Sequence, residues 1–391
     1  MNNKKSSVPK LRFPEFTDAW EQRKLGNVVE IIMGQSPSSE YYTDNPEDYI
    51  LVQGNADIKN GKVFPRVWTT QITKMSKKND LIMSVRAPVG DMAKTDYEVV
   101  LGRGVCAIRG DEFIYQLLNK MKIDGYWQTL STGSTFESIN SSDIKNAQIV
   151  ISSQQEQQKI GSFFTALDRL ITTHQRKLEN VKKLKKSLLQ KMFPKSGQEF
   201  PEIRFPEFTD AWEQRKLGKL ADFNPRSNLP DEFKYVDLES VVGTELTGYR
   251  FENKLSAPSR AQRLAQKGDI FYQTVRPYQK NNYLFEFEDE NFVFSTGYAQ
   301  LRPLINGRFL FSKLQEDRFV QQVLDKCTGT SYPAINSSDL SEIKVYIPDN
   351  KQEQQKIGSF FTALDRLITT HQRKLENVKN LKKALLQQMF V

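Results

Sequence analysis

Two long stretches of the chain repeat their apolar residues every seven positions. In the first stretch, residues 155–193, one set of apolar positions starts at Ile160 and a second set starts four places later at Phe164. Five heptads with this spacing predict a long helix that buries one stripe against another helix, as in a coiled coil. A capping box of Ser153 and Glu156 predicts where the helix starts, and Pro194 predicts where it ends.

The second stretch, residues 352–391, is a near copy of the first. Gln155–Phe193 recurs as Gln352–Phe390 with three changes in 39 positions. The predicted coiled-coil seam consists of Ile160, Phe164, Leu167, Ile171, His174, Leu178, Val181, Leu188, Ile357, Phe361, Leu364, Ile368, His371, Leu375, Val378 and Leu385. Leu184 is expected to substitute where Lys185 interrupts this pattern. Two equal copies favour pairing with each other, and the alternative is that each helix lies on a globular core.

A second repeat marks the start of each half of the chain. Residues Arg12–Gly26 recur identically as Arg204–Gly218. Between the repeats lie two blocks, 27–154 and 219–351, whose sequences mostly differ. Constant flanks around divergent inserts indicate one architecture used twice, with each insert adapted to a different target.

An antiparallel helix pair would return the chain from the second block to the first. It would place the blocks at opposite ends of a spacer of about 57 Å, at 1.5 Å per residue, around a pseudo-two-fold axis. His174 and His371 hold equivalent heptad positions and should meet near this axis. A hydrogen-bonded pair that sets the helix register is favoured over a pH switch or a metal ligand.

The divergent blocks share a strand-rich, mixed α/β pattern. Expected strands cover 28–33, 49–53, 81–85, 99–108, 270–275, 283–287, 292–294 and 343–347, and expected helices cover 112–130 and 308–326. Asp80–Arg86 in the first block echoes Asp269–Arg276 in the second. A glycine loop followed by Ile-Asn-Ser-Ser-Asp also occurs in both, ending at Asp143 and at Asp339.

The charge of the chain lies mainly in the two long helices. The formal net charge is +9, with nine basic against three acidic residues in 155–193 and seven against three in 352–391. Residues 27–154 and 219–351 carry slightly more acidic than basic side chains, so any DNA contact there needs local basic patches. No apolar run suits a membrane span or signal peptide, and Cys106 and Cys327 are not placed to form a disulfide. A reducing cytoplasm is therefore expected.

This organisation resembles the specificity subunit of Type I restriction–modification enzymes over essentially the whole chain. The resemblance rests on the duplicated Gln-Glu-Gln-Gln-Lys-Ile-Gly-Ser-Phe-Phe helix and the duplicated Phe-Pro-Glu-Phe segment, and Gly34–Ser38 looks like a turn of that family. It implies an α+β fold with two target recognition domains separated by an antiparallel two-helix coiled coil. The implied division is 1–154 for the N-terminal arm and first domain, 155–193 for the first spacer helix, 194–351 for the linker and second domain, and 352–391 for the second spacer helix.

The resemblance also implies a non-catalytic subunit that binds a bipartite, asymmetric DNA target. Two methyltransferase subunits and restriction subunits would dock on it, and S-adenosylmethionine, ATP and magnesium would bind to those partners rather than to this chain. The residues agree, because no adenine-methyltransferase loop, Walker A loop or usual zinc spacing occurs. Pro230–Lys234 resembles a nuclease motif but suits a turn before a strand. A standalone DNA-binding protein and an enzyme with a cryptic site remain alternatives.

Polar and basic side chains on loops between strands are the candidate DNA contacts. They are Gln53, Lys77, Lys78, Arg86, Arg103, Ser134, Thr135, Gln273, Arg276, Lys280, Thr330, Ser331 and Tyr332. For Arg86 and Arg276, an internal salt bridge is an equal alternative. The hydroxyl-rich glycine loops around Ser134 and Ser331 would serve almost as well to cap the next strand. The lysines near 182–186 suit a solvated face as well as a phosphate track.

Overall fold

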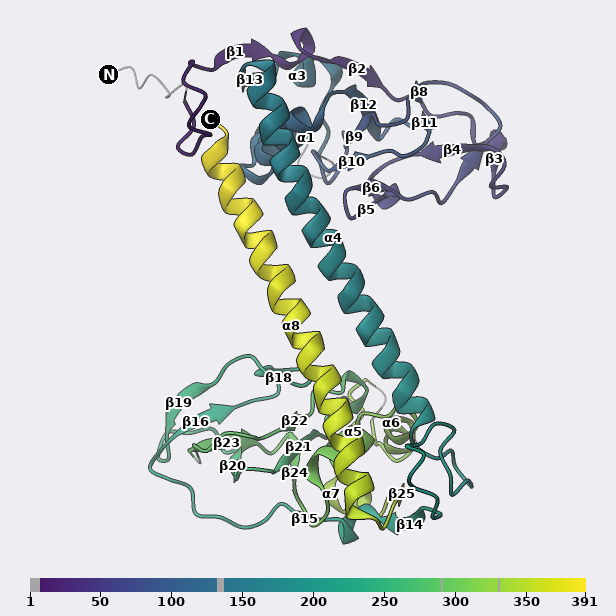
Figure 1. Cartoon of the computed structure of the whole chain (residues 1–391), viewed down its shortest axis with the longest axis vertical. Coiled ribbons are helices and arrows are strands. Elements are labelled where there is room, and N and C mark those ends of the chain that lie inside the picture. Colours follow the sequence, from purple (N-terminus) through teal and green to yellow (C-terminus); the bar gives the residue numbers. More distant parts are fainter. Residues whose placement is uncertain (1–7, 132–136, 290, 330) are drawn as a thin grey trace. The chain divides into compact units, whose positions relative to one another are not determined.

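The computed structural model describes residues 8–131, 137–289, 291–329 and 331–391. The chain forms two compact units (Figure 1), one of residues up to Thr173 together with Lys374–Val391 and the other of His174–Arg373. Each unit holds one divergent block and part of both long helices. The division predicted at residues 154, 193 and 351 follows the sequence repeats, whereas the compact units divide each long helix in two.

The two heptad stretches form the long helices α4, Gln154–Lys191, and α8, Lys351–Met389. In the first unit the start of α4 packs against the end of α8, where the rings of Phe164 and Phe390 are 5.8 Å apart. In the second unit the end of α4 meets the start of α8, where the rings of Phe193 and Phe361 are 5.9 Å apart. The helix segments within each unit are therefore antiparallel. The predicted fold class, strand-rich α/β blocks with antiparallel long helices, is confirmed.

All sixteen predicted seam residues are buried or half-buried, but the expected substitution by Leu184 is wrong. Leu184 is 50% exposed. Lys185 itself takes the seam position and forms an ion pair with Asp365 on α8. One residue along a helix turns the side chain by about 100°, which moves Leu184 off the stripe. The His174 and His371 Nδ1 atoms lie 3.4 Å apart, as antiparallel pairing predicts.

The first block contains two sheets built from short strands. One has the order β2 (Glu30–Met33), β12 (Val105–Arg109), β9 (Leu81–Ser84), β10 (Met92–Lys94), β6 (Lys62–Val63) and β5 (Ile58–Lys59). The other has the order β3 (Tyr42–Thr43), β7 (Trp68–Thr69), β4 (Tyr49–Val52), β11 (Val99–Leu101) and β8 (Met75–Ser76). The single strand expected over 99–108 is thus two strands of different sheets, because Gly102–Gly104 turns the chain between them.

The second block repeats the core of this arrangement. Its first sheet has the order β15 (Ala221–Phe223), β24 (Tyr298–Pro303), β21 (Ile270–Gln273) and β22 (Tyr283–Leu284). Its second sheet has the order β19 (Arg250–Asn253), β16 (Glu232–Val236), β23 (Phe292–Ser295) and β20 (Ala261–Leu264), and β17 (Val241–Val242) pairs with β18 (Glu245–Leu246). The strands β2-β12-β9-β10 correspond to β15-β24-β21-β22, and β4-β11-β8 correspond to β16-β23-β20. The echoed sequences therefore build the same frame.

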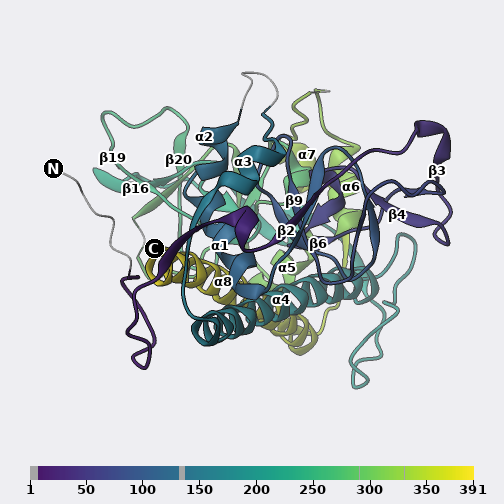
Figure 2. The same ribbon diagram turned by 90° about the horizontal axis from the view of Figure 1, so that it is seen from above.

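Helices complete each block on one side of these sheets. They are α1 (Glu112–Ile123), α2 (Tyr126–Leu130) and α3 (Ser141–Asn146) in the first block, and α5 (Gly307–Leu314), α6 (Asp317–Leu324) and α7 (Ser337–Ser341) in the second. Each helix expected over 112–130 and 308–326 is in fact two, and Gly125 breaks the first at φ +76°. In both views β3 and β4 lie away from α1 and α3, and β16 and β19 lie away from α6 and α7 (Figures 1 and 2).

The repeated flanking segments form the same structure in both units. The strand β1 (Glu21–Lys24) pairs antiparallel with β13 (Gln148–Ile151), and β14 (Glu213–Lys216) pairs with β25 (Lys344–Ile347) in the same register. Asn140 caps α3 and Asn336 caps α7 through side-chain oxygens that accept backbone N–H groups. The Ile-Asn-Ser-Ser-Asp repeat is therefore a helix start that leads directly into the strand before each long helix.

A buried carboxylate anchors the start of α4. Glu156 is 0% exposed, and its two oxygens accept hydrogen bonds from Arg12 Nε at 2.6 Å and Nη2 at 2.8 Å. Trp20 Nε1 donates to the same carboxylate at 3.2 Å. The hydrogen bond to Glu156 raises the pKa of the Arg12 guanidinium. A buried charge is stable only when it is paired and hydrogen-bonded in this way.

The same site recurs at the start of α8. Glu353 accepts from Arg204 at 2.7 and 2.8 Å and from Trp212 Nε1 at 3.3 Å. The capping box predicted at Ser153 and Glu156 is therefore only half formed, as is its counterpart at Asn350 and Glu353. Asn350 Oδ1 still accepts from the Glu353 backbone N–H at 3.3 Å. The glutamate side chain turns away to the arginine, because a bidentate ion pair is a stronger interaction than one bond to a backbone N–H.

A glycine in each long helix lets the block approach closely. At Gly358 an added Cβ would lie 2.6 Å from the backbone nitrogen of Phe309, at the first turn of α5. At Gly161 it would lie 2.9 Å from the Cβ of Glu112 in α1. The glycine of the Gln-Glu-Gln-Gln-Lys-Ile-Gly repeat is therefore required by helix–helix contact rather than by backbone conformation.

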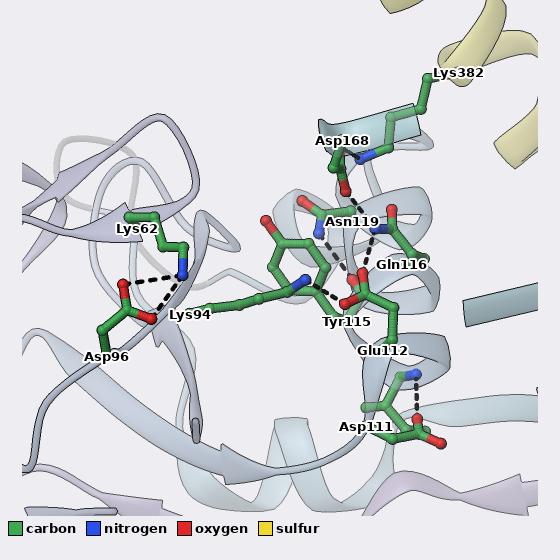
Figure 3. Close-up of polar contacts among 11 residues, drawn as sticks. Lys62, Lys94, Asp96, Asp111, Glu112, Tyr115, Gln116, Asn119, Asp168 and Lys382 are labelled. Atoms are coloured by element: carbon green, nitrogen blue, oxygen red, sulfur yellow. Dashed lines mark hydrogen bonds and ion pairs between the residues drawn. The ribbon is translucent and has the colours of Figure 1, made fainter. Parts of the chain in front are cut away.

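A polar chain connects the first block to both long helices beside this contact (Figure 3). Gln116 Nε2 donates to Glu112 at 2.7 Å and to Asp168 of α4 at 2.9 Å. Asp168 also accepts from Lys382 of α8 at 2.7 Å, and Lys94 of β10 forms an ion pair with Glu112. The block is thus held to the helices by hydrogen bonds and ion pairs of mostly half-buried side chains as well as by apolar packing.

We predict that Glu353→Ala destabilises the protein by about 3–5 kcal/mol, since it leaves Arg204 and Trp212 buried without their acceptor. Glu156→Ala should cost a similar amount because the site is duplicated. Glu376→Ala is the matched control, since Glu376 is an exposed residue of α8. Urea unfolding followed by circular dichroism measures the effect. Equal midpoints for Glu353→Ala and Glu376→Ala would contradict the anchoring role.

Candidate nucleic-acid interface

Three loops of the first block meet where its two sheets adjoin. The first loop is Gly34–Ser38, which directly follows β2 and which the sequence likened to a turn of the family. Its Ser38 N–H donates to Gln71 Oε1 at 2.9 Å. Thr73 Oγ1 donates to the Gln35 carbonyl in the segment before β8. Arg103, in the turn between β11 and β12, donates its backbone N–H to Ser36 Oγ at 3.0 Å. These contacts bring residues from three distant parts of the sequence into one exposed surface.

Two predicted DNA contacts lie at this surface. The Arg103 side chain is exposed, and no ion pair joins it to any residue in the described ranges. Gln53 is half-buried directly after β4, beside the same turn, because Gly102 N–H donates to the Val52 carbonyl at 2.8 Å. The predicted Lys77 and Lys78 are also exposed, in the turn from β8 to β9, where Lys77 N–H donates to Asp80 Oδ2 at 2.7 Å.

The second block forms the equivalent surface from different residues. The loop after β15 and the middle of β20 line a polar hollow, whose walls are Asn224, Pro225, Arg226, Ser227, Asn228, Gln262 and Arg263. Asn224 holds the loop to the sheet, since its Oδ1 accepts from Gln300 N–H at 3.0 Å and its Nδ2 donates to Ser337 Oγ at 2.8 Å. The frame is therefore constant while the side chains that face outward change.

Arg86 and Arg276 are not equivalent, although the sequence suggests that they end matching strands. Ile139 N–H donates to the Val85 carbonyl, and Ile335 N–H donates to that of Thr274. These bonds align Arg86 with Val275 and Ala87 with Arg276. The one-residue offset reverses the face on which each arginine lies. Arg86 is exposed, and no residue of the described chain is an ion-pair partner for it.

Two predicted DNA contacts of the second block are engaged within the protein. Gln273 is only 2% exposed, and its side chain is hydrogen-bonded to Gln279 and to the backbone of Asn281. It organises a loop and has no free edge for a base. Lys280 forms an ion pair with Asp317 and donates to the Gln315 carbonyl at 2.9 Å. Its ammonium group is therefore committed within the protein.

The glycine loops are described only in part. Ser134, Thr135 and Thr330 lie outside the described residues. Ser331 is exposed, Tyr332 is 63% exposed, and the Arg276 guanidinium lies 4.3 Å from the centre of the Tyr332 ring. A cation stacked on an exposed aromatic ring presents donors and a flat surface, which suits contact with nucleic acid.

Three basic residues at these surfaces escaped the sequence analysis, namely Lys74, Arg226 and Arg263. Lys74 and Arg263 each lie six residues before the aspartate of the echoed strand, at Asp80 and Asp269. Extending the alignment of Asp80–Arg86 with Asp269–Arg276 towards the N-terminus would have found this pair. Arg226 has no such signal, because its partner position in the first block is part of the loop that differs.

The described residues hold no group of three or more histidine, cysteine or acidic side chains placed to bind a metal. Pro230–Lys234 leads into β16, where Lys234 forms an ion pair with Asp289 at 2.5 Å. Burial raises the pKa of the Cys106 thiol to about 12, so this thiol stays protonated at neutral pH. Among helices in the described ranges, none combines the length and apolarity that a membrane crossing needs.

Comparison with known proteins identifies related chains over both halves. Residues 17–183 and 210–380 each match the Type I restriction modification DNA specificity domain. A putative Type I restriction enzyme specificity subunit, MjaX, from Methanocaldococcus jannaschii is 30% identical over 197 residues, which are 47% of this chain and 44% of that protein. The MjaIX specificity subunit of the same organism is 23% identical over 95% of this chain and 92% of its own length.

A solved structure shows the same fold. The S subunit of a Type I restriction–modification system from M. genitalium superposes with a TM-score of 0.69 at 20% identity, covering 98% of this chain and 99% of that one. The duplicated domain match covers most of the sequence, including both divergent blocks and most of both long helices. The chain therefore belongs to the Type I restriction–modification specificity subunits, a family of non-catalytic DNA-recognition proteins.

Proposed function

We propose that this chain reads a bipartite, asymmetric DNA target, with one part read by each block. The observation that carries the proposal is one strand frame built twice around loops that differ. Equivalent frames would approach DNA in equivalent ways, and different loops would contact different bases. Arg103 in one block and Arg226 in the other are exposed cations at corresponding surfaces.

The chain would also hold the enzymes that act on the DNA. Two copies of a methyltransferase subunit, together with restriction subunits, would bind to it and supply the catalytic groups and the cofactors. The repeated helices support two identical partners, since their exposed faces repeat as well as their buried ones. Leu170 and Leu367 are equivalent and 48% and 42% exposed, and Leu184 and Leu381 are equivalent and 50% and 51% exposed.

A standalone DNA-binding protein would lack these partners. Co-expression with a methyltransferase of the same restriction system and affinity purification separates the two functions. A stable complex that methylates adenine supports the specificity subunit. A chain that binds one DNA sequence tightly and retains no methyltransferase would favour the standalone protein.

Exchanging residues 219–351 for the corresponding block of another family member should change one half of the methylated target and leave the other half intact. The reason is that each block carries its own loops on its own frame. Mapping of methylated adenines in DNA modified by the complex gives the result. A change in both halves would show that the two blocks do not read independently.

Arg103→Met and Lys280→Met should have opposite effects. Arg103 is exposed, so its loss should leave unfolding within about 0.5 kcal/mol of the parent and weaken DNA binding. Lys280 is internally paired, so its loss should lower stability by about 1 kcal/mol and leave affinity unchanged. Thermal melting and fluorescence anisotropy with a labelled duplex measure both. If Lys280→Met lost DNA affinity while its melting temperature stayed that of the parent, Lys280 would be a DNA contact after all.

We further propose that the lengths of α4 and α8 set the gap between the two half-sites. Inserting one heptad after Lys177 and one after Lys374 keeps the apolar stripe in phase and adds about 10 Å, or roughly three base pairs. The methylated target should keep both half-sites with a correspondingly longer gap. A two-residue insertion at the same places is the control and should impair folding. An unchanged gap in the heptad variant would assign the spacing to the partner subunits.

A further inference from the structure

Arg263 is a half-buried cation without a counter-charge. It lies in β20 of the second block, and no carboxylate in the described part of the chain lies within ion-pair distance of its guanidinium. Its Nε is buried and has no hydrogen-bond partner among those residues. Nearby on the same frame, Arg302 binds both oxygens of Asp269 at 2.9 Å. Arg263 therefore lacks the carboxylate partner that Arg302 has on the same frame.

Such an arrangement costs free energy in the isolated chain. Burial lowers the pKa of Arg263, the direction expected when a cation loses water and gains no anion. A group of this kind is usually paired in folded proteins or completed by a ligand. The missing partner should be an anion that reaches the group from outside.

The hollow beside Arg263 has the chemistry of an anion site. Of the side chains that line it, Arg226 supplies a second guanidinium, which is exposed, and none is a carboxylate. Asn224 and Gln262 are held by bonds to Ser337 and to the Ser259 carbonyl, so the two guanidinium groups are its charged donors. Arginine forks match the paired oxygens of a phosphate group.

The first block carries a cation at the same place in its frame. Arg263 pairs with Phe294 of β23, and the Lys74 carbonyl accepts from Leu101 N–H of β11 at 2.7 Å. Phe294 and Leu101 are equivalent positions, since they pair with Val236 and Val52 on the matching strands β16 and β4. Lys74 is exposed, and within the described ranges it too has no ion-pair partner.

A cation at the same place in both blocks indicates whether the ligand is a base or the sugar–phosphate backbone of DNA. The blocks differ in sequence and, under the proposed function, read different bases. A cation common to both therefore suits the part of DNA that does not vary, which is the sugar–phosphate backbone. We propose that Arg263 binds a backbone phosphodiester of the DNA held by the second block, with Arg226 beside it, and that Lys74 does the same in the first block. This inference rests on the proposed function.

The test compares variants of the full chain in complex with its methyltransferase partner. A labelled 40-base-pair duplex of mixed sequence serves as the probe, titrated over a series of KCl concentrations. Arg263→Met should weaken binding about tenfold at low salt and reduce the slope of log K against log[KCl] by about 0.9, the value for one phosphate contact. Arg263→Lys should restore most of the slope. Arg215→Met is the control, since Arg215 is exposed, lies on β14 and is paired with Glu213.

Melting temperature separates a ligand role from a structural one. Arg263→Met should melt at or above the temperature of the parent, because it removes an uncompensated buried charge. A lower melting temperature for both the methionine and the lysine variant, with an unchanged salt slope, would overturn the proposal. So would unchanged binding to mixed DNA combined with a change at one base of the methylated target, since Arg263 would then read a base. A parent complex that binds no duplex would instead overturn the proposed function.

Discussion

The pairing of a buried glutamate with an arginine at the start of each long helix is the interaction on which the rest of the structure depends. Glu156 joins the segment before the first block, through Arg12 and Trp20, to the first turn of α4. Trp20 in turn packs against Phe390 from the end of α8, with ring centroids 6.2 Å apart. One carboxylate thus connects the beginning of the chain, the start of one helix and the end of the other. A buried charge is stable only while it keeps its partners. Glu156 therefore leaves little freedom in how Arg12 and Trp20 are placed against the start of α4.

As a result, the constant parts of each unit, which are the repeated segments and the shared strands, are separate from the loops that vary. The repeated segments supply the anchoring carboxylate, the close-packed glycine and the paired phenylalanines, Phe164 with Phe390 and Phe193 with Phe361, and these recur in both units. Within each block the shared strands are stabilised by their own ion pairs, such as Arg302 with Asp269. The loops at the ends of these strands contribute little to this stabilisation. They are free to differ between the blocks, which is the property that a protein reading two different DNA sequences requires.

Charge is distributed according to the same division. Many basic side chains of the blocks are committed to internal ion pairs, as Lys280 is to Asp317 and Lys234 to Asp289. A block with no net positive charge can still present cations to DNA, because exposed cations such as Arg103 and Arg226 lie at the loop surfaces. Recognition would then depend on position rather than on total charge, and non-specific attraction to DNA would stay low.

The sequence by itself determined the two long helices and the duplicated frame, because heptad spacing, caps and repeats are local or periodic signals, while the antiparallel pairing was implied by the family resemblance. It also located the exposed Arg103. Only the tertiary structure decided that Gln273 is buried, that Lys185 rather than Leu184 faces the other helix, and that Arg86 and Arg276 are out of register. Pairing and burial depend on residues far apart in the chain. The uncompensated charge of Arg263 belongs to this second group, since a missing partner is visible only when all the neighbours are in place.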